Sequence, residues 1–151
     1  MSAIPQQRPV VAVLAVCPRA DEVLLVRRAN PPDAGRWGFP GGKIENGEPL
    51  LAAAERELHE ETGIEARARE VFTAVDAFDI DEAGTLRRHF VLVAVLCEEA
   101  SGVPLAGDDA LEAAWFPLAR LEEAGLALSL DVAKVARMAA DLARQSRPAP
   151  P

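Results

Sequence analysis

The sequence predicts an α/β fold in which a mixed β-sheet is sandwiched between α-helices. Two observations favour it. Apolar runs of strand length recur along the chain. One amphipathic helix is expected in the middle of the chain and one near its end. The chain has 151 residues, half of them hydrophobic, which is enough to bury one core. We therefore expect a single domain over residues 1–145.

Two strands are predicted in the first quarter of the chain. Residues 10–16 form a continuous apolar run, which is typical of a strand buried on both faces. Residues 18–21 resemble a turn and residues 22–28 a second strand, so these two strands are expected to pair as a hairpin. A proline-containing loop over 30–37 and a short extended piece over 37–42 follow.

A helix is predicted over residues 49–62. Leu50, Leu51, Ala54 and Leu58 fall within one stripe at helical spacing. Proline is tolerated in the first turn of such a helix, and Gly63 stands where a left-handed C-terminal cap belongs. The helix is therefore expected to turn an apolar face to the core.

The second half of the chain predicts a hairpin, a short strand and two helices. In chain order, strands are expected at 67–79, 86–97 and 113–116, and helices at 117–123 and 130–144. The turn at 81–84 joins the first two strands. Residues 146–151 contain three prolines and are expected to form a disordered tail.

The charge balance excludes some classes of partner. The formal net charge is -8 and the pI is about 4.8, so the overall field does not attract nucleic acid or an anionic membrane. The chain has neither an apolar run long enough to span a membrane nor a secretory signal, which predicts the cytoplasm. Cys17 and Cys97 match no zinc motif and are expected to be buried free thiols.

Three carboxylates crowd one face of the predicted central helix. Glu57, Glu60 and Glu61 span an arc of about 100°. Like charges at this spacing each cost roughly 0.2–0.5 kcal/mol, and the negative end of the helix dipole adds to that cost. A bound divalent cation removes both penalties, because Mg²⁺ and Mn²⁺ prefer oxygen ligands. The alternative is a solvated acidic helix face.

The segment around these glutamates resembles a known family signature. Residues 42–64, GKIENGEPLLAAAERELHEETGI, are similar to the Nudix pattern Gly-x5-Glu-x7-Arg-Glu-aliphatic-x-Glu-Glu-x-Gly-aliphatic, with no departure at a defining position. The preceding residues 37–41 also resemble the usual lead-in. The resemblance implies the Nudix fold and metal-dependent hydrolysis of the pyrophosphate bond of a nucleoside diphosphate linked to another moiety.

The resemblance also implies the roles of particular residues. It makes Arg56, Glu57, Glu60 and Glu61 the catalytic set, with Arg56 orienting the carboxylates by ion pairing. It makes the three glutamates and the backbone carbonyl of Gly41 the ligands of Mg²⁺ or Mn²⁺. Glycines there are expected to permit backbone angles that let a carbonyl face the ion. Glu48 is expected to be structural.

Neither the catalytic base nor the phosphate contacts follow from the signature. Some family members use a glutamate of the signature as the base and others an acidic residue of a later loop, for which Asp108 and Asp109 are the candidates here. Arg27, Arg28 and Arg88, together with Arg87, are candidate substrate contacts. Adjacent strand residues face opposite ways, so at most one of each pair is expected to reach the site.

The substrate class is the least determined feature. The chain resembles the bacterial branch that includes ADP-ribose pyrophosphatases and MutT-like enzymes, which favours ADP-ribose or a related nucleoside diphosphate sugar, with a (d)NTP as the other candidate. A nucleotide is then the partner, and the family implies a homodimer. The alternatives are a catalytically retired Nudix domain that senses nucleotides and a structural Ca²⁺ site. The Asp-rich loop spacing of a calcium site is missing.

Overall fold

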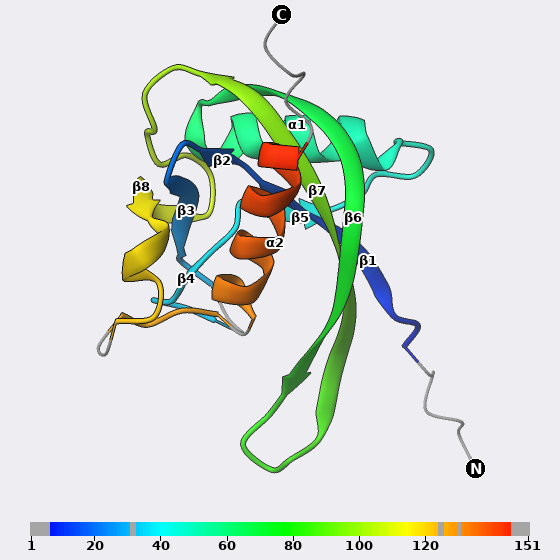
Figure 1. The fold of residues 1–151 in the computed structure, drawn as a ribbon. Coiled ribbons are helices and arrows are strands. Elements are labelled where there is room, and N and C mark those ends of the chain that lie inside the picture. Colours follow the sequence, from blue (N-terminus) through cyan, green and yellow to red (C-terminus); the bar gives the residue numbers. More distant parts are fainter. Residues whose placement is uncertain (1–6, 31–32, 124–125, 130, 146–151) are drawn as a thin grey trace, which may run out of the picture.

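A mixed four-stranded sheet forms the centre of the molecule. The computed structural model describes residues 7–30, 33–123, 126–129 and 131–145. In spatial order this sheet contains β5 (Gly41–Lys43), β1 (Val10–Val16), β7 (Leu86–Ser101) and β6 (Glu65–Ile80). β1 is parallel to β7, whereas the other neighbours are antiparallel. The predicted class, a mixed sheet flanked by helices, is confirmed (Figure 1).

A second, antiparallel sheet holds the remaining strands. It contains β2 (Pro18–Arg19), β3 (Glu22–Arg28), β4 (Trp37–Gly38) and β8 (Ala110–Pro117). The predicted hairpin between residues 10–16 and 22–28 is therefore wrong. The tight turn joins β2 to β3 instead, and β1 pairs with β5 and β7. β1 lies between β5 and β7, and its alternate side chains pack into two different core clusters, so both of its faces are buried, which suits its unbroken apolar run.

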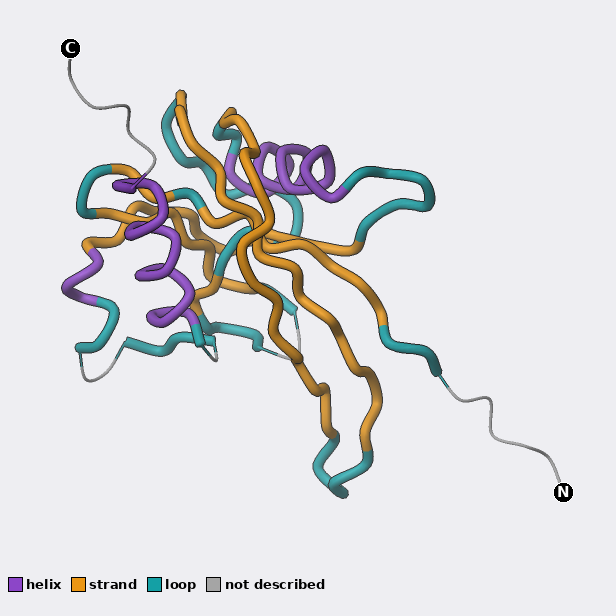
Figure 2. The backbone as a smooth tube through the Cα atoms, turned by 45° about the vertical axis from the view of Figure 1, so that its right-hand side comes forward, coloured by secondary structure: helices purple, strands orange, loops and turns teal. Residues whose placement is uncertain are grey.

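The two α-helices cover opposite faces of the first sheet. Along β1, Val13 and Ala15 belong to the core cluster of α1 (Leu50–Thr62), whereas Val16 belongs to the cluster of α2 (Val132–Gln145). Successive strand residues face opposite ways, so each helix receives alternate side chains. Figure 2 shows the strands passing between the two helices.

Helix α1 has the boundaries that its sequence predicts. It begins after Pro49 and ends at Gly63, which has a φ of 72° and donates its N–H to the carbonyl of His59 at 2.8 Å. Ala54 and Leu58 are fully buried. The hydroxyl of Thr62 donates to the Leu58 carbonyl within the buried face. This packing fixes which side of the helix remains free to face a cavity.

Several elements differ in length from their predictions. β6 and β7 are longer than expected and form a curved ribbon whose tip projects from the body (Figure 1). The predicted helix at 117–123 is a single 3-10 turn, Leu118–Arg120. The predicted tail at 146–151 lies outside the described residues. None of the described helices is long and apolar enough to cross a membrane.

Both cysteines are buried and reduced, as predicted. Burial raises the pKa of Cys17 to about 12 and also raises the pKa of Cys97. Protonated thiols of this kind behave as small hydrophobic side chains. They therefore contribute packing next to α1.

Candidate active site

A cavity of about 590 Å³ opens between the sheets and collects residues from both helices. Glu57 and Glu61 reach its wall from α1, next to Gly41 and Gly42 of β5. Arg28, at the end of β3, contributes from the second sheet. The cavity has the size typical of small-molecule sites, which range over roughly 300–1,000 Å³.

Arg56 is the centre of a network of carboxylates. Its guanidinium donates two hydrogen bonds of 2.7 Å to Glu48, one of 2.8 Å to Glu57 and one of 3.3 Å to Glu60. It also donates to the carbonyl of Lys43 at 3.3 Å. The bond to Glu48 raises the pKa of Arg56, and the same bond lowers the pKa of Glu48 to about 2. Glu48 thus anchors Arg56, a contact that its expected structural role near the helix start did not specify.

Glu57 and Glu61 differ from Glu48 in that burial raises their pKa values. Burial raises the pKa of Glu61 to about 7, against the opposing hydrogen bond from the Gly41 N–H at 3.1 Å. Burial also raises the pKa of Glu57, while the bond from Arg56 lowers it. Carboxylates that are desolvated in this way gain from a cation placed between them.

Gly41 and Gly42 lie so close to neighbouring atoms that a side chain at either position would not fit. Neither has a positive φ, so the expectation that these glycines supply unusual backbone angles is not met. A Cβ on Gly42 would lie 2.6–2.8 Å from the carboxylate of Glu57. A Cβ on Gly41 would lie 2.1 Å from the carbonyl oxygen of Val13. Both glycines therefore let β5 lie directly against β1 and the glutamates.

The donor groups fit a hard divalent cation. Glu57 and Glu61 line the cavity, and Glu61 has one hydrogen bond, to Oε2, among the described residues. Glu60 is 43% exposed and lies outside the cavity lining. Within the part of the chain that the structure describes, no three acidic, histidine or cysteine side chains already converge on one point. Glu57 and Glu61 are thus the structurally supported members of the expected ligand set.

A later loop places an acidic residue beside Glu61. The N–H groups of Leu105 and Gly107 donate to the carbonyls of Thr62 and Glu61, each at 2.9 Å, which ties the loop to the end of α1. A Cβ on Gly107 would lie 2.5 Å from the Glu60 carbonyl oxygen. The loop continues to Asp109, which lines the cavity, whereas Asp108 does not. The charge of Asp109 adds to the raised pKa of Glu61.

The candidate arginines separate into one that lines the cavity and three that do not. Arg28 lines it, whereas Arg27 binds Glu112 at 2.7 Å on the opposite face of β3. This is the alternation that adjacent strand residues predict. Neither Arg87 nor Arg88 lines the cavity, and Arg87 binds Asp79 at 3.0 Å near the tip of the β6–β7 ribbon.

Five polar residues of the cavity were missing from the sequence prediction, namely Asn30, Asp33, Lys43, Glu45 and Ser129. Lys43 follows the two glycines directly, so its place inside the signature was a usable signal. Ser129 lines the cavity from the segment before α2. Its sequence neighbourhood carries no motif, and only the fold places it there.

The comparison with known proteins decides the family. A family model described as the NUDIX domain matches residues 6–137 of the chain. The chain belongs to the Nudix family. The crystal structure of a MutT NUDIX hydrolase from Burkholderia pseudomallei superposes on this Nudix fold with a TM-score of 0.72 and 31% identity, covering 89% of this chain and 98% of that one.

The chain is also similar to two curated relatives with different named activities. The ADP-ribose pyrophosphatase of Methanocaldococcus jannaschii is 34% identical over 113 residues, which cover 75% of this chain and 64% of the relative. The CTP pyrophosphohydrolase of Escherichia coli is 38% identical over 112 residues, covering 64% of this chain and 83% of the relative. The chain therefore spans less than two thirds of the length of the first of these relatives.

Proposed function

We propose that this Nudix chain hydrolyses the pyrophosphate bond of a nucleoside diphosphate linked to another moiety, with Mg²⁺ or Mn²⁺ bound. The observation that carries the proposal is the meeting of two part-buried carboxylates, Glu57 and Glu61, with Arg28 in the wall of one cavity. Carboxylates suit the ion and a guanidinium suits a phosphate oxygen. Together they provide for a metal–pyrophosphate complex that the net charge of -8 would otherwise repel.

ADP-ribose or a related nucleoside diphosphate sugar is the proposed substrate class. The name of the Methanocaldococcus jannaschii relative, ADP-ribose pyrophosphatase, supports it. The name of the Escherichia coli relative, CTP pyrophosphohydrolase, supports a nucleoside triphosphate as the second candidate. The cytoplasmic location and the homodimer stay predictions from the sequence.

Each residue of the site has a proposed part in the reaction. Glu57 and Glu61 hold the ion, with Glu60 and the Gly41 carbonyl as further ligands implied by the family signature. The ion, when bound, neutralises phosphoryl charge and acidifies a water molecule. Arg56 keeps Glu57 in place through its 2.8 Å bond. Arg28 binds a phosphate oxygen, and Asp109 accepts the proton of the attacking water.

The alternative is a non-enzymatic function, in which the domain senses nucleotides by binding them without cleavage. Loss of a carboxylate of the signature would favour it, and all of them are present. The two functions differ in whether a bound nucleotide is converted to product.

Substitution of the two cavity glutamates tests the proposal. Glu57→Gln and Glu61→Gln keep the shape of the side chain and remove its charge. Metal stabilisation of the transition state is worth several kcal/mol, so we expect kcat to fall roughly 100-fold or more in either variant. Phosphate-containing products from ADP-ribose and CTP would be measured with Mg²⁺.

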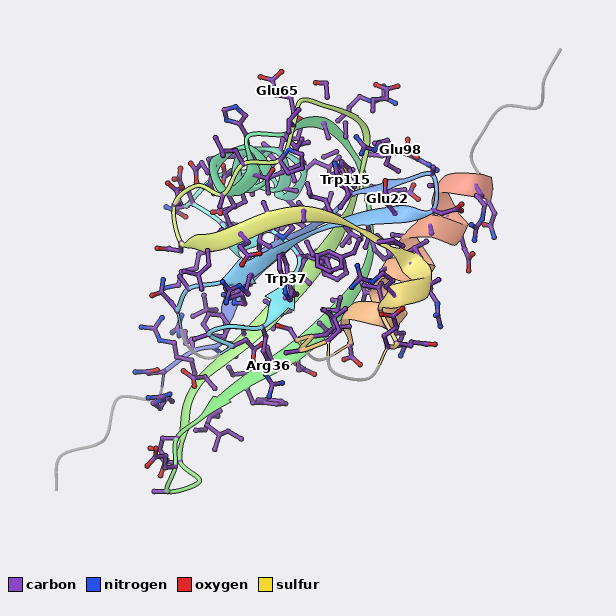
Figure 3. All side chains as sticks on the ribbon, turned by 90° about the vertical axis from the view of Figure 1, so that its left-hand side faces the viewer. Glu22, Arg36, Trp37, Glu65, Glu98 and Trp115 are labelled. Atoms are coloured by element: carbon purple, nitrogen blue, oxygen red, sulfur yellow. The ribbon has the colours of Figure 1, made fainter. Side chains whose placement is uncertain are left out.

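A matched control uses an exposed glutamate outside the cavity. Glu65 lies at the start of β6 and points into solvent (Figure 3). Glu65→Gln is expected to keep the activity of the unsubstituted protein. Tight nucleotide binding without any product would support the sensor instead, and unchanged turnover in both Glu57→Gln and Glu61→Gln would contradict the site.

A further inference from the structure

Ser129 is held at the cavity by the backbone around it. Its N–H donates to the carbonyl of Trp37 at 2.9 Å, and Leu128 forms a bridge with the same residue. Figure 3 shows Trp37 beneath β8. The centroid of its ring lies 4.7 Å from the ring centroid of Phe116. The position of Ser129 is therefore set by packed structure on the second sheet.

The hydroxyl of Ser129 has no hydrogen-bond partner in the part of the chain that the structure describes. Its Oγ is screened from solvent and makes no hydrogen bond with any described residue. Gly38 leaves room beside it, because a Cβ there would lie 3.2 Å from Oγ. Buried hydroxyls are nearly always paired, so an unpaired one in a cavity wall calls for a ligand. The residue as a whole is half-buried, and both it and Gly38 line the cavity.

The surroundings of Ser129 differ from those of the glutamates. Val132 and Val135 line the cavity from α2, together with Phe39, Phe90 and Leu92. α2 and α1 belong to different core clusters, so this apolar wall and the carboxylates come from opposite sides of the first sheet. A phosphate finds no cation in this apolar wall, whereas a flat heteroaromatic ring finds apolar contacts and one hydroxyl that both donates and accepts.

We propose that Ser129 is a specificity-determining residue that hydrogen-bonds the nucleobase of the substrate. The inference rests on the proposed function, since it assigns the end of the substrate that lies away from the pyrophosphate. It assigns the hydroxyl to an edge of the base and the apolar side chains to its faces. It predicts that a pyrophosphate compound without a base does not use Ser129.

The test compares Ser129→Ala with Ser101→Ala in the full chain. Ser101 donates to the Glu65 carbonyl at 3.5 Å, outside the cavity, so it controls for loss of a serine hydroxyl. The probes are ADP-ribose and CTP, which carry a base, and 5-phosphoribosyl 1-pyrophosphate, which does not. KM, kcat and the ligand-induced shift of the melting temperature would be measured with Mg²⁺ present.

Loss of one neutral hydrogen bond is expected to raise KM and Kd for the nucleotides about fivefold to tenfold. The kcat should change less than twofold, and the affinity for the base-free probe should stay the same. Since the hydroxyl is unpaired among the described residues of the free protein, Ser129→Ala should not lower its melting temperature. Ser101→Ala should leave all nucleotide constants unchanged.

Three results would overturn the inference: unchanged nucleotide affinity, an equal loss for the base-free probe, or a lower melting temperature of the free Ser129→Ala protein. Failure of the proposed function is distinguishable, because binding is measured without turnover. A wild-type protein that binds ADP-ribose without cleaving it contradicts hydrolysis, and the weaker binding of Ser129→Ala would still support the inference. Wild-type protein that binds neither nucleotide overturns both.

Discussion

At the scale of single residues, Arg56 keeps a cluster of like charges in order. One guanidinium contacts three carboxylates: Nε and Nη2 donate to Glu48, whereas Nη1 donates to both Glu57 and Glu60. A planar fork can do this, whereas the single ammonium of a lysine cannot. Glu61, which Arg56 does not reach, depends on the Gly41 N–H instead. Among the three glutamates at the end of the helix, Glu61 is therefore the one that Arg56 does not pair.

The pairing of Glu48 with Arg56 predicts a pH-dependent stability. The bond lowers the pKa of Glu48 from 4.5 to about 2, so the carboxylate stabilises the folded state above pH 4.5. That contribution is lost as the pH falls from 4.5 toward 2, because protonation then removes the charge. We expect Glu48→Gln to lower the free energy of unfolding at pH 7 and to have no such effect near pH 2. Urea unfolding at several pH values would measure the difference.

A double-mutant cycle provides the control for this pH effect. If Arg56 is its cause, Glu48→Gln should have little pH-dependent effect in an Arg56→Gln background. If Glu48→Gln lowered the free energy of unfolding by the same amount at pH 7 and near pH 2, the assignment of the effect to the Glu48–Arg56 pair would be contradicted.

At the scale of elements, helix α1 connects the core to the cavity. Leu58 is fully buried against the first sheet, and Glu57 and Glu61 of the same helix line the cavity. The helix therefore cannot rotate to hide its carboxylates without exposing Leu58. The left-handed cap at Gly63 ends the helix directly after the site and lets the chain turn into β6.

Replacement of Gly63 tests how much this cap contributes. Nothing lies within 4 Å of a Cβ built on Gly63, so Gly63→Ala adds no clash and only the cost of a φ of 72°. That cost is roughly 1–2 kcal/mol for a residue with a side chain. We expect the free energy of unfolding to fall by that amount in urea denaturation.

Asp108 offers a comparison for Gly63→Ala, since it already has a φ of 47° with a side chain. Asp108→Gly is expected to leave stability unchanged or raise it slightly, because glycine relieves the same strain. A Gly63→Ala protein as stable as the unsubstituted one would show that the cap does not constrain the helix end.

At the scale of the whole molecule, the cavity concentrates negative charge in an already acidic protein. The net charge is -8, and Glu57, Glu61 and Asp109 line one cavity with Arg28 and Arg56 as their nearby guanidinium groups. Burial raises the pKa of both glutamates, so the folded state without an ion carries an electrostatic cost there. Binding of a divalent ion should therefore stabilise the fold.

Thermal unfolding in Mg²⁺ or Mn²⁺ tests this coupling. At an ion concentration 100 times the Kd, the stabilisation is about 2.7 kcal/mol, which corresponds to a rise in Tm of roughly 5–10 °C for a chain of this size. Glu61→Gln should remove most of the rise and Glu65→Gln none of it. An equal rise with KCl at matched ionic strength would mean that screening, and not a bound ion, is responsible.

The sequence by itself determined the central helix, its cap and the cluster of glutamates. These features depend on neighbours within a few residues, where apolar spacing, a glycine cap and like charges on one helix face are visible along the chain. Helix α1 accordingly begins and ends where its spacing predicts, whereas the pairing of Glu48 with Arg56 was not predicted and emerges from the structure.

Only the tertiary structure decided which distant residues share the cavity. It separates β1 from β3 into two sheets, selects Arg28 over Arg27 and Asp109 over Asp108, and brings Ser129 to the wall. Strand pairing and loop anchoring join segments far apart in sequence, and neighbouring residues carry no signal for them. A local pattern can thus place the carboxylates proposed to bind the metal, but the proposed substrate contacts arise only when both sheets close around the cavity.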